Sequence, residues 1–429
     1  MLPARALALA RANAGALWLL GASTIANVLA YAYQVVMARL LRPEEYAILT
    51  AFFAVLILEQ LGGQVVQSAT AKLVAQYAAR GEEAALRVFV RRWLGRILLL
   101  AGLPALVVLG LAFLVRVEPL SPLAVGILGV TLFFAILLTF TLGLLQGLAR
   151  FSWLGGVFIG MAFARLAVGV TLVLWLTGSI APFTQPVNGA FLGAASALLL
   201  GAIGTLVPLA PLLRAARGAV HEVDLGRSET RFFLLAAVIF ICYAALTFVD
   251  GLVAPWRIPA EAGAYAAAIT MGKVVLFAPI AVGLILLERT SRADALGLDP
   301  DRYLFASLAF VLVTSGTVSL AYLVAPGPLT ALVVGSQYPG TAAIVGLYGL
   351  AALSNALLSL WVAYFVGRGR MSIGALLATA IVTELVLLLT VAQDAATMVR
   401  IVLGVSVAMQ AAAIAIYAVD RARRGTLPR

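Results

Sequence analysis

Long apolar runs separated by short polar breaks form the main pattern of this 429-residue chain. Most of the runs reach the roughly 20 residues that a helix needs to cross a bilayer. The polar breaks are rich in arginine, aspartate, glutamate and proline. The pattern predicts twelve spanning helices, at 15–38, 46–68, 94–115, 122–148, 153–177, 188–213, 232–254, 263–287, 303–324, 329–366 (only its second part spanning), 371–392 and 397–419.

Composition supports the same class of protein. Hydrophobic residues make up 63% of the chain and charged residues 11%, and the mean hydropathy is +1.09. Soluble globular proteins carry about a quarter charged residues, so this chain has too little polar surface to be one of them. We therefore expect an all-α, polytopic membrane protein.

The basic residues predict how the chain is oriented. When the loops are assigned alternately to two sides, one side receives only Arg39, Arg42, Arg116, Arg257 and Arg400, and the side of the termini receives the other loop arginines and Lys72. This asymmetry follows the positive-inside rule and places both termini in the cytoplasm. The net charge of +11 is thus explained by membrane orientation and anionic headgroups, without nucleic acid.

Two cytoplasmic segments have their own character. Residues 71–93 alternate apolar and basic positions at helical spacing, which predicts a helix lying at the headgroup level. Residues 214–231 are the most polar stretch and fall near the middle of the chain. They are predicted to link an N-terminal six-helix lobe, 1–213, to a C-terminal one, 232–429.

A short motif occurs in both halves. "MARLLRPEEYAIL" (37–49) has a counterpart in "APWRIPAEAGAYAAA" (254–268), where Pro43 matches Pro259, Glu45 matches Glu261 and Ala47 matches Gly263 at one constant spacing. Each copy joins an odd span to an even one on the outer side. The halves are therefore predicted to form a parallel repeat about an axis along the membrane normal.

Four stretches carry a family resemblance: "YQVVMARLLRPEEYAIL" (33–49), "LLQGLARFSWLGGVFIGMAFARLAVGV" (144–170), "FVDGLVAPWRIPAEAGAYAAAITMGKVVLFAPIAV" (248–282) and "VVGSQYPGTAAI" (333–344). In order and spacing they resemble bacterial polysaccharide flippases of the Wzx type, in the multidrug/oligosaccharidyl-lipid/polysaccharide (MOP) superfamily. The resemblance implies a MATE-like fold with two lobes around a central cavity. It also implies alternating-access transport of a polyprenyl-diphosphate-linked oligosaccharide across the bacterial cytoplasmic membrane.

Ionisable residues inside spanning helices cost roughly 2.5–3.5 kcal/mol for a central Arg or Lys, so each needs a reason. Arg165, near the centre of the fifth span, is a candidate for holding the diphosphate, because a guanidinium fits phosphate oxygens. The alternative is a buried arginine paired with an acid or reaching an interface. Glu59 and Lys273 lie at similar depth in matching spans and either form an ion pair or gate across the cavity or face separate polar neighbours.

Other candidates concern coupling and sugar binding. Glu384 and Asp250 are possible proton or cation sites, although pairing with Arg257 or capping of a helix also explains Asp250. Three uncharged residues of the first two spans are further candidates for the cavity. Their side chains suit sugar hydroxyls or interhelical hydrogen bonds, and they are Asn27, Gln34 and Gln64. The glycine pairs Gly143/Gly147, Gly156/Gly160 and Gly189/Gly193 are predicted to pack helices.

The sequence predicts no cofactor, no metal site and no enzyme activity. The pair Gly272-Lys273 lacks the upstream glycine of a phosphate-binding loop, and the single histidine, His221, lies in the predicted linker. The expected partners are the lipid-linked oligosaccharide, membrane lipids and the polysaccharide polymerase and glycosyltransferases of the same pathway.

Three alternative functions remain open. A cation-coupled drug exporter of the same superfamily generally has an acidic residue in its first span, where this chain offers Asn27 and Gln34. A peptidoglycan-precursor flippase usually has fourteen spans. An integral membrane glycosyltransferase or polymerase needs catalytic groups on sizeable outer loops, and the predicted outer loops are short.

Overall fold

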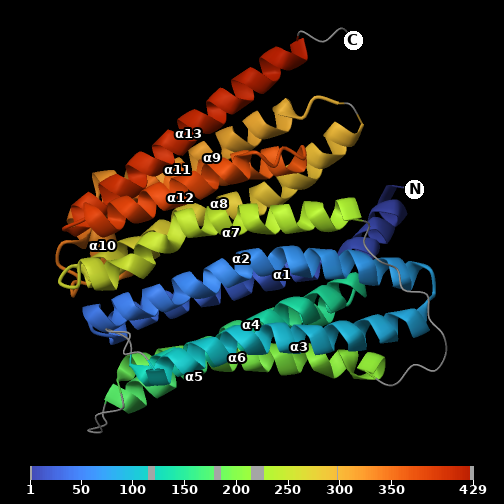
Figure 1. Ribbon diagram of the computed structural model, residues 1–429, viewed down its shortest axis with the longest axis horizontal. Helices are drawn as coiled ribbons and strands as arrows, with labels where there is room; N and C mark the ends of the chain where they lie inside the picture. The colour runs from blue at the N-terminus through green and yellow to red at the C-terminus, as the bar shows by residue number, and fades with distance from the viewer. Residues whose placement is uncertain (1, 115–120, 178–184, 214–226, 297, 426–429) are drawn as a thin grey trace. The chain divides into compact units, whose positions relative to one another are not determined.

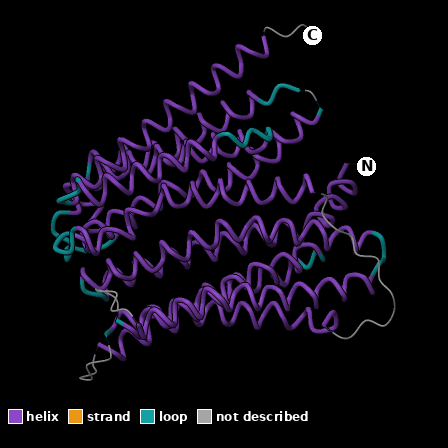
Figure 2. The backbone as a smooth tube through the Cα atoms, viewed as in Figure 1, coloured by secondary structure: helices purple, strands orange, loops and turns teal. Residues whose placement is uncertain are grey.

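The computed structural model describes residues 2–114, 121–177, 185–213, 227–296 and 298–425. They form helices joined by short turns and loops, with no strand among them (Figures 1 and 2). The helices are α1 Leu2–Leu40, α2 Pro43–Ala79, α3 Glu83–Leu114, α4 Pro122–Gly147, α5 Phe151–Thr177, α6 Pro186–Leu209, the 3-10 turn η1 Ala210–Leu213, α7 Arg227–Arg257, α8 Ala262–Ala295, α9 Asp301–Val324, α10 Pro326–Val333, α11 Thr341–Gly367, α12 Ile373–Thr390 and α13 Ala395–Gly425.

Each predicted span falls on a helix of its own. Eleven of the described helices are long and apolar enough to cross a membrane, and α8 contributes a shorter apolar segment, Ala262–Phe277. The predicted run 329–366 is divided into α10 and α11 by a turn in which Gly335 and Gly340 have positive φ angles of 95° and 93°, a conformation that glycine adopts without strain. The prediction of an all-helical, multi-pass membrane protein is confirmed.

The expected headgroup-level helix over 71–93 is not formed. The spanning helix α2 continues to Ala79, and α3 begins at Glu83 after a tight turn. Gly81 has a φ of 69° in this turn, and the Gly81 and Glu82 amides donate to the carbonyls of Ala78 and Tyr77. Because glycine allows the left-handed backbone, the segment reverses between two spanning helices.

The chain divides into two compact units. Unit 1 contains Met1–Leu41 and Glu59–Ala237, and unit 2 contains Arg42–Leu58 and Val238–Arg429. Residues 42–58 thus group with the C-terminal unit, whereas the sequence places them in the lobe 1–213. Of the predicted linker 214–231, residues 214–226, with His221, lie outside the described residues.

Contacts of the two motif copies explain why 42–58 belong to unit 2. Gly263 lies directly against the Pro43 ring and backbone, with no room for a Cβ. The Tyr46 hydroxyl shares a buried 2.5 Å hydrogen bond with Thr270 Oγ1 of α8. These contacts hold the first part of α2 on α8, so the helix belongs to unit 2 at its start and to unit 1 after Leu58.

The matching glutamates both cap helices, but different ones. Glu45 Oε2 accepts from the Arg42 amide at 3.1 Å, at the start of its own helix α2. Glu261 Oε2 accepts from the Ala395 amide at 2.7 Å, at the start of α13. An acid at a helix N-terminus satisfies free amides and complements the helix dipole, which is a structural use for both residues.

Glycine contacts pack the helices of unit 1, as predicted for two of the three pairs. A Cβ on Gly193 of α6 would lie 2.5 Å from the Gly169 Cα of α5, and a Cβ on Gly143 of α4 would lie 2.7 Å from the Gln67 carbonyl oxygen of α2. Among the described residues, Gly156 and Gly160 have no such neighbour within 4 Å, so the packing prediction is wrong for that pair.

Candidate functional site

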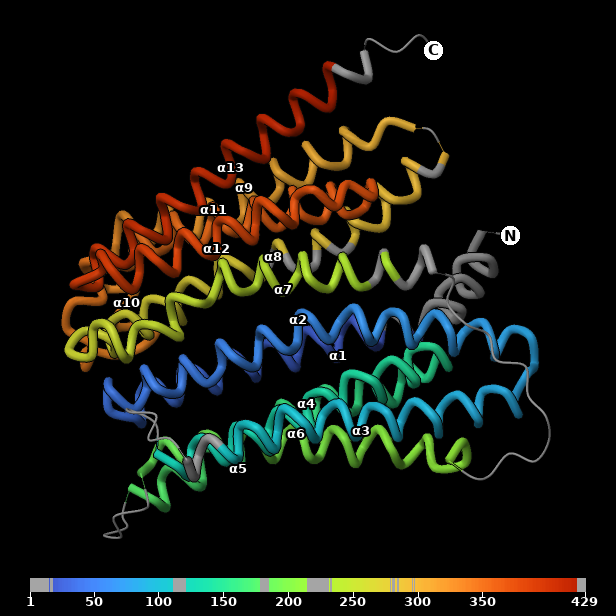
Figure 3. Tube along the Cα trace, viewed as in Figure 1, coloured from blue at the N-terminus to red at the C-terminus, as the bar shows by residue number. Residues whose placement is uncertain are grey.

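Arg165 lies half-buried on α5 in unit 1, where α5 runs beside α6 (Figure 3). The close approach of Gly193 to Gly169 also brings α6 within 3.0 Å of the Arg165 carbonyl oxygen, measured from a Cβ built on Gly193. The buried Tyr33 of α1 donates to the Ala190 carbonyl of α6 at 2.7 Å, and its hydroxyl interacts electrostatically with the Arg165 guanidinium. The cation therefore lies near Tyr33, where helices α1, α5 and α6 meet.

Glu59 lies on α2, on the side that packs against α4. Its Oε1 accepts a long hydrogen bond, 3.5 Å, from the Thr139 hydroxyl. Gly63, one turn further along, has the same threonine within 2.8 Å of a built Cβ. A second polar contact follows on the same pair of helices, where Gln67 Nε2 donates to Gln146 Oε1 at 3.0 Å. Glu59 thus belongs to a polar seam between α2 and α4.

The uncharged candidates differ in exposure. Asn27 and Gln64 are exposed, and Gln34 is half-buried. Exposed amides within spanning helices can donate to and accept from a ligand hydroxyl.

Lys273 is half-buried on α8 in unit 2, whereas Glu59 belongs to unit 1. The ion pair or gate between them therefore stays a prediction. Within unit 1, Glu59 has a polar neighbour in Thr139, and the alternative, that the two residues face separate polar neighbours, also stays a prediction.

Asp250 of α7 is almost completely buried, at 1% exposure. Its Oδ2 accepts from the Tyr265 hydroxyl of α8 at 2.8 Å and from the Tyr348 hydroxyl of α11 at 3.1 Å. Its Oδ1 accepts from the Gly251 amide at 2.7 Å. The two tyrosine rings pack edge to face with centroids 5.7 Å apart, which holds both hydroxyls on one oxygen.

The alternative interpretation of Asp250 as the partner of Arg257 is wrong for the described contacts. The Arg257 guanidinium instead donates to the Thr390 carbonyl at 3.5 Å. The aspartate lies inside the helix bundle of unit 2, where its hydrogen bonds come from two other helices. A buried carboxyl with three donors is a built polar site and not an interfacial ion pair.

Glu384 of α12 lies beside this site. It is 1% exposed, and its carboxyl is close enough to Asp250, Tyr265 and Tyr348 for electrostatic interaction. Its Oε1 is buried and has no hydrogen-bond partner in the part of the chain that the structure describes. Two neighbouring buried carboxyls do not both keep a charge unless a proton or cation neutralises them.

A small cavity adjoins the same tyrosine. It has a volume of about 10 Å³ and is lined by Thr247, Tyr348 and Asn355, with apolar residues around them. This is close to the smallest volume that holds one water. Asn355 is 3% exposed, and its Oδ1 is a buried acceptor without a described donor. Within the described ranges, no cluster of three His, Cys, Asp or Glu residues forms a metal site.

Comparison with known proteins identifies the fold. No protein-family model and no curated protein matches the chain. Among solved structures, the chain is similar to an inward-facing multidrug resistance MATE family transporter of the MOP superfamily, with a TM-score of 0.70 and 13% identity over 95% of this chain and 96% of that one. The fold is that of the MATE transporters.

Two other structures with the MATE-like fold are also similar. The eukaryotic MATE transporter AtDTX14 gives a TM-score of 0.58 at 16% identity, over 95% of this chain and 96% of that one. A MOP superfamily transporter from Pyrococcus furiosus, described as having a binding pocket of reverse polarity, gives 0.53 at 14% identity, over 96% and 94% of the two chains. At these identities the likeness concerns the fold.

Within this MATE-like fold, sequence reasoning found the two buried carboxyls but missed the side chains around them. Tyr265 and Tyr348 donate to Asp250 from positions 15 and 98 residues away, and Asn355 lines the neighbouring cavity. Tyr265 does fall in the AGAY segment that the motif comparison singles out. Nothing in the spacing of Tyr348 or Asn355 distinguishes them from ordinary polar residues of a spanning helix.

Proposed function

We propose that this protein is a membrane transporter that moves a polyprenyl-diphosphate-linked oligosaccharide from the inner to the outer leaflet by alternating access. The MATE-like fold over almost the whole chain supports a transporter, and the four motif stretches favour a lipid-linked sugar as cargo. The protein would act in the bacterial cytoplasmic membrane with both termini in the cytoplasm. The polymerase and glycosyltransferases that use the same carrier lipid would be its partners.

Arg165 is the observation on which this function chiefly depends. A guanidinium in the middle of a spanning helix is costly, and here it lies near Tyr33, where three helices of unit 1 meet. Two parallel N–H donors suit the oxygens of a diphosphate. We assign Arg165 the role of holding the diphosphate as it crosses the membrane.

The remaining candidates suit the rest of such a cargo. Asn27, Gln34 and Gln64 offer amide donors and acceptors on α1 and α2 for sugar hydroxyls. Lys273 supplies a second cation on α8. If Glu59 pairs with Lys273, the anionic cargo would displace Glu59 from the lysine. The polyprenyl tail would stay in the bilayer throughout.

A cation-coupled exporter of the same fold is the second candidate, and one observation favours it. Asp250 and Glu384 form a buried pair of carboxyls in unit 2, with a free carboxyl oxygen on Glu384 among the described atoms. Such a pair suits binding of a proton or a monovalent cation during a transport cycle. Coupling of this kind is also compatible with flipping, so the cargo decides between the two functions.

The decisive experiment measures lipid-linked intermediates in a strain that lacks the gene. Loss of a flippase should leave the lipid-linked oligosaccharide on the cytoplasmic face, inaccessible to a reagent added outside. Complementation with wild type should restore access, and Arg165→Gln should lower the rate at least about tenfold, since a hydrogen bond to a charged group contributes roughly 1.5–3 kcal/mol. Arg165→Lys should recover part of the rate, because it keeps the charge and loses the fork.

Arg91→Gln is the matched control, because Arg91 is an exposed arginine of α3 in the same unit. It should behave as wild type. Unchanged lipid-linked sugars in the deletion strain would overturn the flippase function. Efflux of a cationic drug by the wild type, with Arg165→Gln unaffected, would establish the exporter instead.

A further inference from the structure

An open groove lies at the end of unit 2 where α11 passes into α12 and α13 approaches its last turns. Its volume is about 340 Å³. The walls are mainly apolar, formed by Phe365 of α11 and by Ala415, Ile416 and Val419 of α13. Val419 is 52% exposed, so the side of the groove that it forms is open to the surroundings of the helix.

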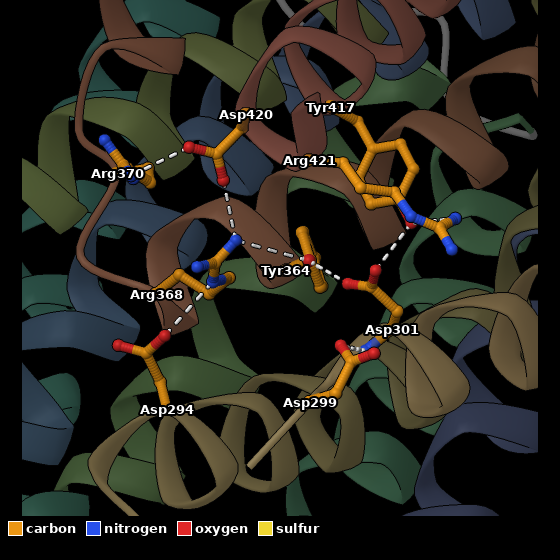
Figure 4. A network of polar contacts seen from close by, with 9 residues as sticks. All are labelled: Asp294, Asp299, Asp301, Tyr364, Arg368, Arg370, Tyr417, Asp420 and Arg421. Atoms are coloured by element: carbon orange, nitrogen blue, oxygen red, sulfur yellow. Dashed lines mark hydrogen bonds and ion pairs between the residues drawn. The ribbon is translucent and has the colours of Figure 1, made fainter. Parts of the chain in front are cut away.

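One end of the groove is polar. Arg370 lines it and forms an ion pair with Asp420, at 2.7 Å between Nη2 and Oδ1 (Figure 4). The other oxygen of Asp420 is held at 2.7 Å by Arg368, which also contacts Asp294 at 3.1 Å. The Arg368 side chain is 9% exposed, whereas that of Arg370 is 54% exposed.

Because of this difference in exposure, the two arginines have different roles. Arg368 lies inside the network that Figure 4 shows, against the ring of Tyr364, whose hydroxyl donates to Asp301. It forms ion pairs with both Asp420 and Asp294. Arg370 contacts the same carboxylate through one terminal nitrogen, Nη2. A guanidinium has five N–H donors, so others remain for a second ligand. Arg370 can therefore bind a second anion without leaving a buried charge unpaired.

The groove lies at the level expected for lipid headgroups. It is at the end of unit 2 that carries Arg289, Arg292, Arg302, Arg368, Arg370 and Arg421, while the opposite end carries Arg257 and Arg400. The positive-inside rule assigns the arginine-rich end to the cytoplasm, where the leaflet is anionic. Beyond the groove, α13 exposes the apolar side chains of Val407 and Ile414, as a helix in contact with acyl chains does.

We propose that this groove binds an anionic phospholipid of the inner leaflet. The lipid phosphate binds the exposed guanidinium of Arg370, and an acyl chain follows Ala415, Ile416 and Val419 along α13. A basic group above an apolar interhelical groove on the cytoplasmic side is the arrangement that binds anionic headgroups. The site is separate from Arg165, and it concerns the lipid around the protein and not the proposed cargo.

Native mass spectrometry of the delipidated, full-length protein tests the site. The protein is titrated with phosphatidylglycerol and, in parallel, with phosphatidylcholine of the same acyl chains. Wild type should retain phosphatidylglycerol preferentially. Arg370→Gln should weaken its binding about tenfold, since a hydrogen bond to a charged group contributes roughly 1.5–3 kcal/mol. It should change the binding of phosphatidylcholine much less, because the trimethylammonium of that lipid already neutralises its phosphate. Arg370→Lys should restore part of the preference.

Two further variants keep the test independent of folding around Arg370. Ala415→Phe fills the apolar part of the groove from an exposed position of α13 and should weaken retention while every charge stays in place. Arg302→Gln removes an exposed arginine of α9 at the same end, outside the groove, and should bind like wild type.

Three outcomes would overturn the proposal. Equal retention of the two lipids by wild type would show that no anionic site exists. Wild-type binding by both Arg370→Gln and Ala415→Phe would place the lipid elsewhere. A polyprenyl diphosphate that requires Arg370, when phosphatidylglycerol does not, would make the groove part of the cargo path.

Discussion

Around Arg165 in unit 1 and around Asp250 in unit 2, spanning helices meet in two different ways. Near Arg165, glycines bring the backbones of α5 and α6 into direct contact. Near Asp250, hydroxyls on α8 and α11 converge on one carboxylate oxygen of α7. Helix packing near Arg165 therefore depends on glycines, which have no side chain, and helix packing near Asp250 depends on hydrogen bonds between polar side chains.

The charges of the two regions are opposite as well. Unit 1 fixes a cation, and unit 2 buries two carboxyls, Asp250 and Glu384. If the halves derive from a parallel repeat, as the matching motifs indicate, their buried chemistry has diverged. Under the proposed function, the cation suits an anionic cargo and the carboxyl pair suits a coupling ion, so cargo binding and coupling would be divided between the units.

The largest expected effect comes from adding a side chain at the glycine contact. Gly193→Val places a branched side chain where a Cβ alone would lie 2.5 Å from the Gly169 Cα. Backbone cannot yield as a flexible side chain does, so we expect α5 and α6 to separate and the unit to lose about 3 kcal/mol or more of stability. Thermal unfolding in detergent measures the loss.

Gly156→Val is the control, because a Cβ on Gly156 meets nothing within 4 Å. Both changes place the same residue in a spanning helix of unit 1. Only the first should lower the unfolding temperature. Equal behaviour of the two variants would show that backbone contact does not hold this region together.

The second-largest effect is expected at Asp250, where two variants distinguish the loss of the hydrogen-bond acceptor from the loss of the charge. Asp250→Ala leaves the buried hydroxyls of Tyr265 and Tyr348 without their acceptor, at a cost of about 1–3 kcal/mol for each group left unsatisfied. Asp250→Asn keeps an acceptor oxygen and should unfold nearer to wild type. If Asp250 serves coupling, both variants should lose the dependence of transport on an ion gradient.

Transport assays in proteoliposomes with imposed proton and sodium gradients provide the measurement, with Glu384→Gln as a parallel variant. Wild-type ion dependence in both Asp250→Asn and Glu384→Gln would show that the carboxyl pair is purely structural. The unit 1 glycine variants have no corresponding prediction for ion dependence, since no carboxyl takes part in that contact.

The sequence was sufficient for the helices because their main determinant is local. Apolar runs of spanning length form helices whatever their neighbours, and so each predicted span corresponds to a helix. The motif at 37–49 also marked a true turn between α1 and α2. Its membership in unit 2 was not predictable, since it results from the fit of Pro43 against Gly263, far along the chain.

Contacts between distant residues also could not be predicted for the side chains of the candidate site. Gly156/Gly160 and Gly189/Gly193 have identical spacing, but only the second pair contacts a neighbour, because spacing defines a face and not what covers it. Likewise, hydropathy marked Asp250 and Glu384 as unusual without showing that they are neighbours. The surrounding tyrosines come from α8 and α11, and their convergence is a property of tertiary packing.

The smallest expected effect is that of Tyr348→Phe, which removes one of the two hydroxyls from Asp250 Oδ2. The Tyr265 hydroxyl still donates to the same oxygen at the shorter distance of 2.8 Å, and the edge-to-face ring contact is kept. We therefore expect a loss of about 1 kcal/mol, less than for Asp250→Ala. In an Asp250→Ala background, Tyr348→Phe should cause no further loss and should recover part of the stability, because it removes a buried hydroxyl that has already lost its acceptor. Additive losses in this double variant would mean that the Tyr348 hydroxyl stabilises unit 2 through a partner other than Asp250, since the ring is present in every variant compared.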